Sequence, residues 1–121
     1  MATKKGKKFT GRKYSKERKK KKYEVAGQKR IVKIGEENKR KIRVRGGNKK
    51  TYFLNSKFIN VKTKQGIKKT TIRNVLETPS NKFLARQDVL SKGTIIETEI
   101  GKARITNRPS QEGVINGVLI E

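Results

Sequence analysis

The 121-residue chain contains no histidine, no cysteine and no tryptophan, and it has only ten acidic residues. Without histidine and cysteine, the commonest general bases, thiol nucleophiles and zinc ligands are missing. The lack of cysteine excludes a disulfide framework and fits a reducing, cytosolic setting. No phosphate-binding glycine motif such as GxGxxG is present. These absences point away from an enzyme and predict no cofactor and no small-molecule substrate.

Acidic residues are scattered, and the pair closest to a metal-binding pattern is Glu97 and Glu99. Residues two apart in a strand lie on the same face. We interpret the two glutamates as charges on a strand surface, because no further metal-ligating side chain accompanies them. No metal site is therefore predicted.

Long hydrophobic runs are also absent, and apolar residues make up only 31% of the chain. No run approaches the roughly 18 residues that cross a bilayer. The first residues, MATKKGKK, lack the apolar region of a signal peptide. No basic helix with a large apolar face is found, which disfavours binding to an anionic membrane. We expect no membrane partner.

Positive charge is what the chain has in excess: 34 lysines and arginines give a net charge of +24. The charge falls along the sequence, from +12 in residues 1–30 to +7 in 31–60, +5 in 61–90 and 0 in 91–121. So large a charge opposes compaction unless a polyanion neutralises it. The gradient therefore predicts a nucleic acid bound at the N-terminal end.

The first part of the chain, residues 1–38, is predicted to be an extended basic segment. It has too few apolar residues to offset the entropy of ordering, so we expect it to become ordered on RNA. Aromatic rings between the cations can stack on bases. A solvated tail or a nuclear import signal would have a similar composition. The candidate RNA-binding residues are Lys7, Lys8, Arg12, Lys13, Tyr14, Arg18, Lys19, Lys20, Lys21, Lys22, Tyr23, Lys29 and Arg30.

A second basic stretch, KRKIRVRGGNKK, spans residues 39–50. In an extended segment, Lys41, Arg43 and Arg45 would point to one face, and Ile42 and Val44 to the other, into a core. Two glycines follow, which permit positive φ and close approach of another backbone. The pattern fits a grip on a phosphodiester chain, although an edge strand protected by charges would look alike. The candidates here are Lys39, Arg40, Lys41, Arg43, Arg45, Gly46, Gly47, Asn48, Lys49 and Lys50.

From residue 39 to residue 121 the pattern predicts a mainly β fold, a small β-barrel-like domain. Strands are expected within 52–63, 67–78, 94–98, 102–106 and 114–120, because β-branched and aromatic residues alternate with turn signals. Segments 94–98 and 102–106 should form a hairpin, and Gly117 should mark a bulge or a close contact. The expected core comprises Ile42, Val44, Phe53, Leu54, Ile59, Val61, Ile72, Val75, Ile95, Ala103, Ile105, Val114 and Leu119.

Several stretches resemble one known family: KKYEV at 21–25, VKIGEE at 32–37, IRVRGGNKK at 42–50, and SKGTIIETEIGKARITNRPSQEGVINGVLIE at 91–121. The family is small-subunit ribosomal protein eight of the archaeal and eukaryotic type (ribosomal protein S8e), here in its shorter archaeal form. The resemblance spans nearly the whole chain.

The resemblance implies a structural constituent of the small ribosomal subunit that binds its rRNA in the cytoplasm, beside neighbouring ribosomal proteins. The family's TGGR motif corresponds to Thr10-Gly11-Arg12, and its paired arginines correspond to Ala85-Arg86. Arg86 thereby joins the candidates. Arg104 and Arg108 are further candidates, although the segment around Pro109 fits a simple turn equally well. An assembly factor on precursor rRNA and a histone-like DNA-binding protein are the alternative functions.

Overall fold

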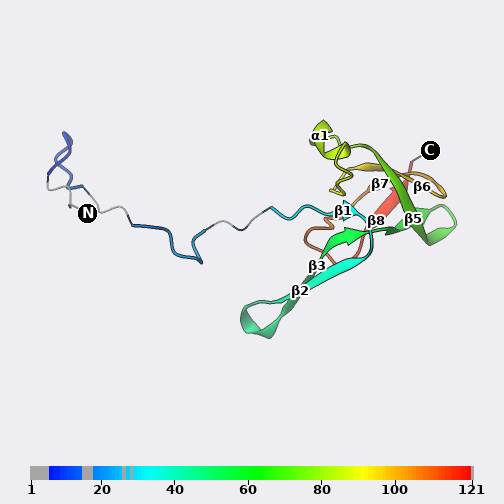
Figure 1. Cartoon of the computed structure of the whole chain (residues 1–121), viewed down its shortest axis with the longest axis horizontal. Helices are drawn as coiled ribbons and strands as arrows, with labels where there is room; N and C mark the ends of the chain where they lie inside the picture. Colours follow the sequence, from blue (N-terminus) through cyan, green and yellow to red (C-terminus); the bar gives the residue numbers. More distant parts are fainter. Residues whose placement is uncertain (1–5, 15–17, 26, 28, 121) are drawn as a thin grey trace.

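The computed structural model describes residues 6–14, 18–25, 27 and 29–120. A folded body begins near residue 32, and the described residues before it extend away from it (Figure 1). The body is mainly β, as the sequence predicts. It combines a three-stranded sheet with a closed five-stranded barrel.

The three-stranded sheet has the order β1-β3-β2. Strand β2 (Asn38–Arg43) and strand β3 (Lys49–Ser56) form an antiparallel hairpin, joined through a 3-10 turn, η1 (Arg45–Gly47). Strand β1 (Lys33–Ile34) runs parallel to β3 on its other side. The hairpin projects from the body, so that the turn lies at its far end (Figure 1).

The barrel has the order β4-β5-β6-β7-β8. Its strands are β4 (Phe58–Thr63), β5 (Gly66–Glu77), β6 (Ile95–Thr98), β7 (Gly101–Ile105) and β8 (Asn116–Leu119). Neighbouring strands are antiparallel except β4 and β8, which close the barrel in parallel. The predicted hairpin is confirmed as β6–β7, and the segment from residue 67 is a strand.

Strand β5 has 12 residues and pairs with different neighbours along its two halves. Its first half pairs with β4 and its second half with β6, with register shifts between Ile72 and Asn74 and between Val75 and Glu77. Such irregularities bend a strand and increase its twist, which allows the sheet to close. A short helix, α1 (Lys82–Ala85), follows, and the side chain of Asn81 caps it by accepting from the Phe83 N–H at 2.9 Å.

Much of the expected core is buried, on the barrel strands and on β3. Phe53, Ile59, Val61, Ile72, Val75, Ala103 and Ile105 are buried and form one cluster, with Leu119 packed against it. Gly117 makes the predicted close contact, since a Cβ there would lie 2.9 Å from Ile59 Cδ1 and 3.1 Å from the Arg104 carbonyl oxygen.

Five core predictions were wrong. Val114 is exposed, and Ile115 is buried in its place; Ile95 is half-buried, and Ile96 fills the core. Each error is a shift of one residue, which exchanges the two faces of a strand. Ile42, Val44 and Leu54 are also only half-buried and lie outside the core cluster. They belong to the projecting hairpin sheet rather than to the barrel.

The start of the folded body is threaded between two parts of the chain. Val32 is 1% exposed, and its carbonyl accepts from the Leu90 N–H at 2.8 Å. On the next residues, β1 pairs with β3, and the Ile34 N–H donates to the Asp88 carbonyl at 3.2 Å. Asp88 adopts a positive φ of 55° at this point. The segment before Lys39 therefore contributes to the core and is anchored on both sides.

Among the described residues, no helix is long and apolar enough to cross a membrane.

Candidate nucleic-acid interface

The hairpin of β2 and β3 presents cations on both of its faces. Residues paired across antiparallel strands share a face. One face therefore holds Lys39, Lys41 and Arg43 with Lys49, which is the register partner of Arg43. The other face holds Arg40 and, opposite Ile42, Lys50. All six cations are exposed.

The prediction that Lys41, Arg43 and Arg45 point to one face of a strand was therefore only partly correct. Lys41 and Arg43 share a face as predicted, but the opposite face is also cationic, because the hairpin projects into solvent instead of lying against the barrel. The strand also ends at Arg43, so Arg45 lies in the turn and not in the strand. The hairpin can thus meet phosphates on two sides.

The turn at the end of the hairpin needs its glycines. Gly46 and Gly47 have φ values of 77° and 78°, which side chains with a Cβ rarely adopt. The Val44 N–H donates to the Asn48 carbonyl at 2.7 Å and closes the loop. The result is an exposed, side-chain-poor tip flanked by Arg45 and Lys49. A nucleic-acid backbone can approach such a tip closely.

Two aromatic rings at the base of the hairpin hold cations in place. The Arg30 guanidinium lies over the ring of buried Tyr52 at 4.0 Å, and the Lys39 ammonium lies over Phe53 at 4.8 Å. Lys39 also pairs with Glu37 at 2.6 Å, and this hydrogen bond lowers the pKa of Glu37. Arg30 therefore links the N-terminal segment to the hairpin.

A small turn occupies residues 6–14. The Lys8 N–H donates to the Arg12 carbonyl and the Gly11 N–H donates to the Lys8 carbonyl, both at 2.8 Å. Lys7 and Lys13 pair as an isolated bridge. The Lys8 ammonium lies 5.8 Å from the centre of the Tyr14 ring. Basic and aromatic side chains are thus brought together on a short exposed loop.

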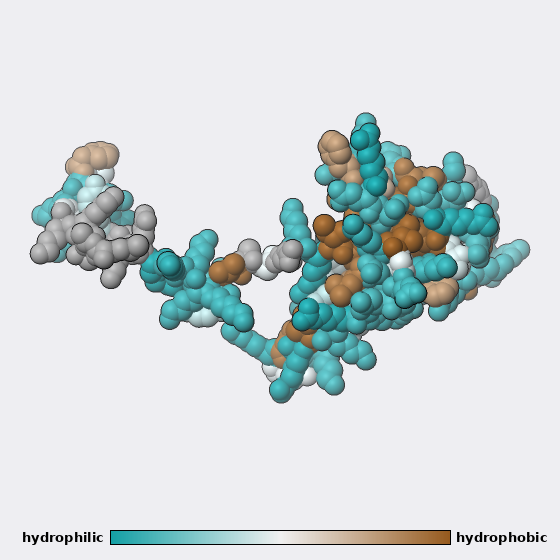
Figure 2. Space-filling view, in the orientation of Figure 1, coloured by the Kyte–Doolittle hydropathy of each residue, from teal (hydrophilic) through white to brown (hydrophobic). Residues whose placement is uncertain are grey.

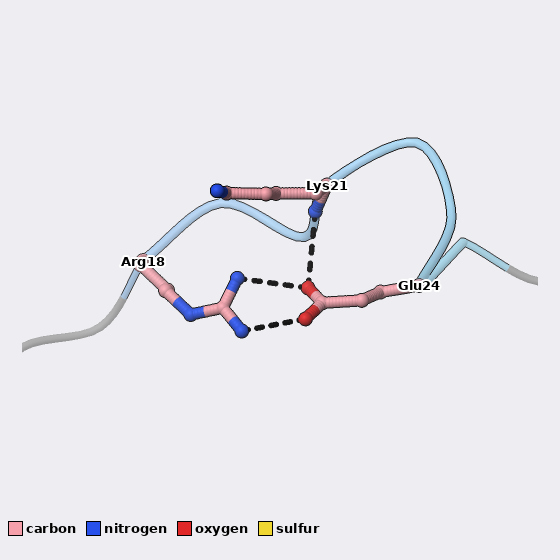
Figure 3. A network of polar contacts seen from close by, with 3 residues as sticks. All are labelled: Arg18, Lys21 and Glu24. Carbon is pink, nitrogen blue, oxygen red and sulfur yellow. Dashed lines mark hydrogen bonds and ion pairs between the residues drawn. The ribbon is translucent and has the colours of Figure 1, made fainter.

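A second turn lies within residues 18–24, which include the four consecutive lysines at 19–22. Arg18 donates to both carboxylate oxygens of Glu24, at 2.8 and 2.6 Å, and the Lys21 backbone N–H donates to the same carboxylate at 3.1 Å (Figure 3). The Arg18 guanidinium, and then the Lys21 N–H, hold the pKa of Glu24 below its usual value, while the pair raises the pKa of Arg18. Lys19, Lys20 and Lys22 remain exposed around this turn, as does Tyr23.

The remaining predicted residues do not all converge on the hairpin. Arg108 lies beside it, because the carbonyl of the next residue, Pro109, accepts from the Phe53 N–H at 3.1 Å. Arg86 lies after α1, with its guanidinium 5.9 Å from the Phe83 ring. Arg104 is on the outer surface of the barrel, paired in register with Val118 of β8. Lys29 is exposed in the segment leading to Arg30.

Two cation–aromatic pairs on the barrel side were missed. The Lys69 ammonium lies over the Phe58 ring at 4.7 Å, and Phe83 is exposed beside Arg86. The alternation of β4 would have placed Phe58 outside, since Ile59 and Val61 point inward. Pairing with Lys69 depends on the register of β4 and β5, which the sequence leaves open.

The described part of the chain holds no cluster of three or more residues able to bind a metal ion. Glu97 lies opposite Lys102 on β6 and β7. Glu99 lies in the turn between these strands, not on the face of Glu97 as the alternation predicted.

Surface hydropathy agrees with this division of the molecule. In Figure 2 the described residues of the N-terminal segment and the hairpin are predominantly hydrophilic, and hydrophobic residues gather over the folded body. The part of the chain richest in cations thus extends from a compact support.

Comparisons with known proteins give one consistent result. The family model described as "Ribosomal protein S8e" matches residues 1–120. Proteins called "Small ribosomal subunit protein eS8" are similar along nearly their whole length. The one from Ignicoccus hospitalis is 49% identical over 95% of this chain and 92% of its own. The one from Nanoarchaeum equitans is 45% identical over 93% and 91%, and the one from Methanocorpusculum labreanum is 42% identical over 94% and 93%.

Proposed function

Since the chain belongs to the ribosomal protein S8e family, we propose that it is a structural constituent of the small ribosomal subunit. In this role it binds and stabilises small-subunit rRNA and supports subunit assembly. It acts as a scaffold and carries out no catalysis. Its place is within the ribosome, in the cytoplasm, beside other proteins of the small subunit.

The observation that carries this proposal is the projecting hairpin with cations on both faces. Among the described residues, Lys39 is the only hairpin cation that forms an ion pair within the chain. The other hairpin cations have no acidic partner among them, so their charge is available to phosphates. Arginine in particular can donate to two phosphate oxygens at once or stack on a base.

Residues 1–38 form the extended RNA-binding segment in this proposal, and residues 39–121 form the barrel-like domain. The two are coupled at Arg30, which lies over Tyr52, and at the threaded strand β1. RNA bound by the segment would therefore lie next to RNA bound by the hairpin. Tyr14 and Tyr23 are exposed and supply rings for stacking on unpaired bases.

The experiment that tests the proposal is ultraviolet crosslinking of the tagged chain in cells, followed by sequencing of the attached nucleic acid. A few sharp sites on mature small-subunit rRNA are expected. The crosslinked peptides, identified by mass spectrometry, should derive from the N-terminal segment and the hairpin.

Other patterns would overturn the proposal in a defined direction. Crosslinks confined to unprocessed precursor rRNA would assign the chain to assembly alone. Crosslinks spread over genomic DNA would assign it to chromatin. Crosslinked peptides derived only from the barrel would remove the hairpin from the interface.

A further inference from the structure

A row of alternating cationic and aliphatic side chains crosses the outside of the barrel. Strand register places Arg104 of β7 beside Val118 of β8, Val118 beside Lys62 of β4, and Lys62 beside Ile67 of β5. All four side chains are exposed. The row exists only because β8 pairs in parallel with β4, which brings the end of the chain next to its middle.

The row borders a groove of about 660 Å³. Lys62, Thr63, Lys64, Arg104, Val118, Leu119 and Ile120 line it. Val118 of β8 and Ile120, just after the end of this strand, are each 39% exposed, which is a large fraction for aliphatic side chains. The groove thus has an aliphatic floor and a cationic rim.

Two of the cations that line the groove, Lys62 and Arg104, are on opposite sides of Val118. Lys62 and Arg104 form no ion pair with another described residue. They flank Val118 from the two neighbouring strands, whose backbones lie about 10 Å apart at a strand spacing of about 4.8 Å. An occupant with negative charge on both sides of an apolar side chain would match them.

An amino-acid chain fits this lining better than RNA does. None of the described residues that line the groove is aromatic, so they offer bases no ring to stack on. The nearest aromatic residue outward on β4 is Phe58, whose ring already lies under the Lys69 ammonium. A phosphodiester chain gains nothing from burying Val118 and Ile120, whereas an aliphatic or aromatic side chain does. Charge complementarity then selects an acidic peptide over a basic one.

We propose that this groove binds an extended acidic segment of a neighbouring protein, with carboxylates on both sides of an apolar anchor residue. The proposal rests on the proposed function, because the partner is expected in the assembled small subunit. Arg104, which the sequence placed among the RNA-binding residues, is reassigned to this protein contact. The hairpin projects from the body as a separate sheet, so RNA and the peptide can be bound together (Figure 1).

The test places a photocrosslinking amino acid, p-benzoylphenylalanine, at Ile120 of the full chain in cells. Small subunits are purified and irradiated, and the crosslinked partner is identified by mass spectrometry. The expected product is a peptide of another protein with acidic residues on both sides of the attachment point. Adding Lys62→Glu and Arg104→Glu should lower the crosslink yield about tenfold through repulsion of like charges. The matched control, Lys82→Glu with Lys92→Glu, changes two exposed cations that do not line the groove and should leave the yield unchanged.

A parallel sample carries the photocrosslinker at Lys41 on the hairpin and should crosslink to rRNA. If only the Ile120 sample fails to crosslink, or if it attaches to RNA or to a basic segment, the groove proposal is overturned and the proposed function stands. If neither sample crosslinks in the ribosomal fraction, both are overturned. Equal loss of yield in the groove variant and the control variant would also refute the role of Lys62 and Arg104.

Discussion

Neutralising one face of the β2–β3 hairpin should weaken RNA binding by a predictable amount. The variant Lys41→Gln, Arg43→Gln, Lys49→Gln removes three exposed cations that register places on the same face. Each phosphate contact contributes about 0.7 to 0.9 to the slope of log affinity against log salt. Loss of three contacts should therefore reduce the magnitude of the slope by about 2.4. At 0.15 M monovalent salt this corresponds to roughly 100-fold weaker binding.

The assay is filter binding to a small-subunit rRNA transcript between 0.1 and roughly 0.5 M salt, a range chosen because affinity varies steeply there. A control variant, Lys82→Gln, Lys92→Gln, Lys102→Gln, has the same net charge but retains the hairpin. Far-ultraviolet circular dichroism verifies that both variants fold.

Two results would refute the reasoning about the hairpin. Equal losses of affinity and slope in the two variants would mean that binding depends on net charge alone. An unchanged slope in the hairpin variant would mean that this face does not contact phosphates.

A further variant, Arg43→Lys with Arg45→Lys, keeps the charge and should still bind RNA less tightly, because lysine lacks the planar, bidentate guanidinium. Unchanged affinity there would reduce both arginines to generic charges.

Three other predictions concern the fold and the N-terminal turn. Gly117→Ala should destabilise the chain by about 1–3 kcal/mol through overpacking. The control Gly27→Ala should not, because there is open space around Gly27. The two variants are compared by their midpoints of unfolding in urea, and equal midpoints would contradict the tight contact at Gly117. Asp88→Val should lower the free energy of unfolding by about 1–2 kcal/mol, because a β-branched residue must then adopt positive φ. An unchanged midpoint of urea unfolding would mean that the backbone relaxes at this position. Arg18→Gln should raise the pKa of Glu24 toward its ordinary value in an NMR titration, because the hydrogen bond from Arg18 is the main cause of the lowered pKa. The lowered pKa means that the ion pair is fully present above the ordinary carboxyl pKa and is lost as pH falls through the lowered one. An unmoved pKa would show that Arg18 is not its cause.

Residue patterns predicted the barrel, but not which residue of an apolar pair points inward. In the segment Thr94–Thr98 two isoleucines are adjacent, so alternation allows either phase. The structure chooses Ile96, because β6 must share its inner face with Ala103 of β7. The choice of Ile115 over Val114 similarly follows from packing. Val32 could not be assigned to the core, because the strand that follows it, β1, has only two residues and therefore shows no periodicity.

The candidate interface was predictable where it depends on local spacing. The positive φ values of Gly46 and Gly47, and the shared face of Lys41 and Arg43, follow from residue type and alternation. The placement of Arg104 near Lys62 does not, because it also requires the parallel pairing of β8 with β4. The pairing of Arg18 with Glu24 was also out of reach, since it depends on a turn with no strong sequence signal.

Closure of the barrel by its last strand has a consequence for synthesis of the chain. Asn60 of β4 pairs with Asn116 of β8, 56 residues later. At about 5–20 residues per second, the ribosome needs several seconds to make that interval. The basic N-terminal segment and the complete β2–β3 hairpin have by then left the ribosome, while β4 still has an open edge. Nascent chains can therefore engage an anionic partner before they complete their fold, and such a partner would shield them during their most aggregation-prone interval.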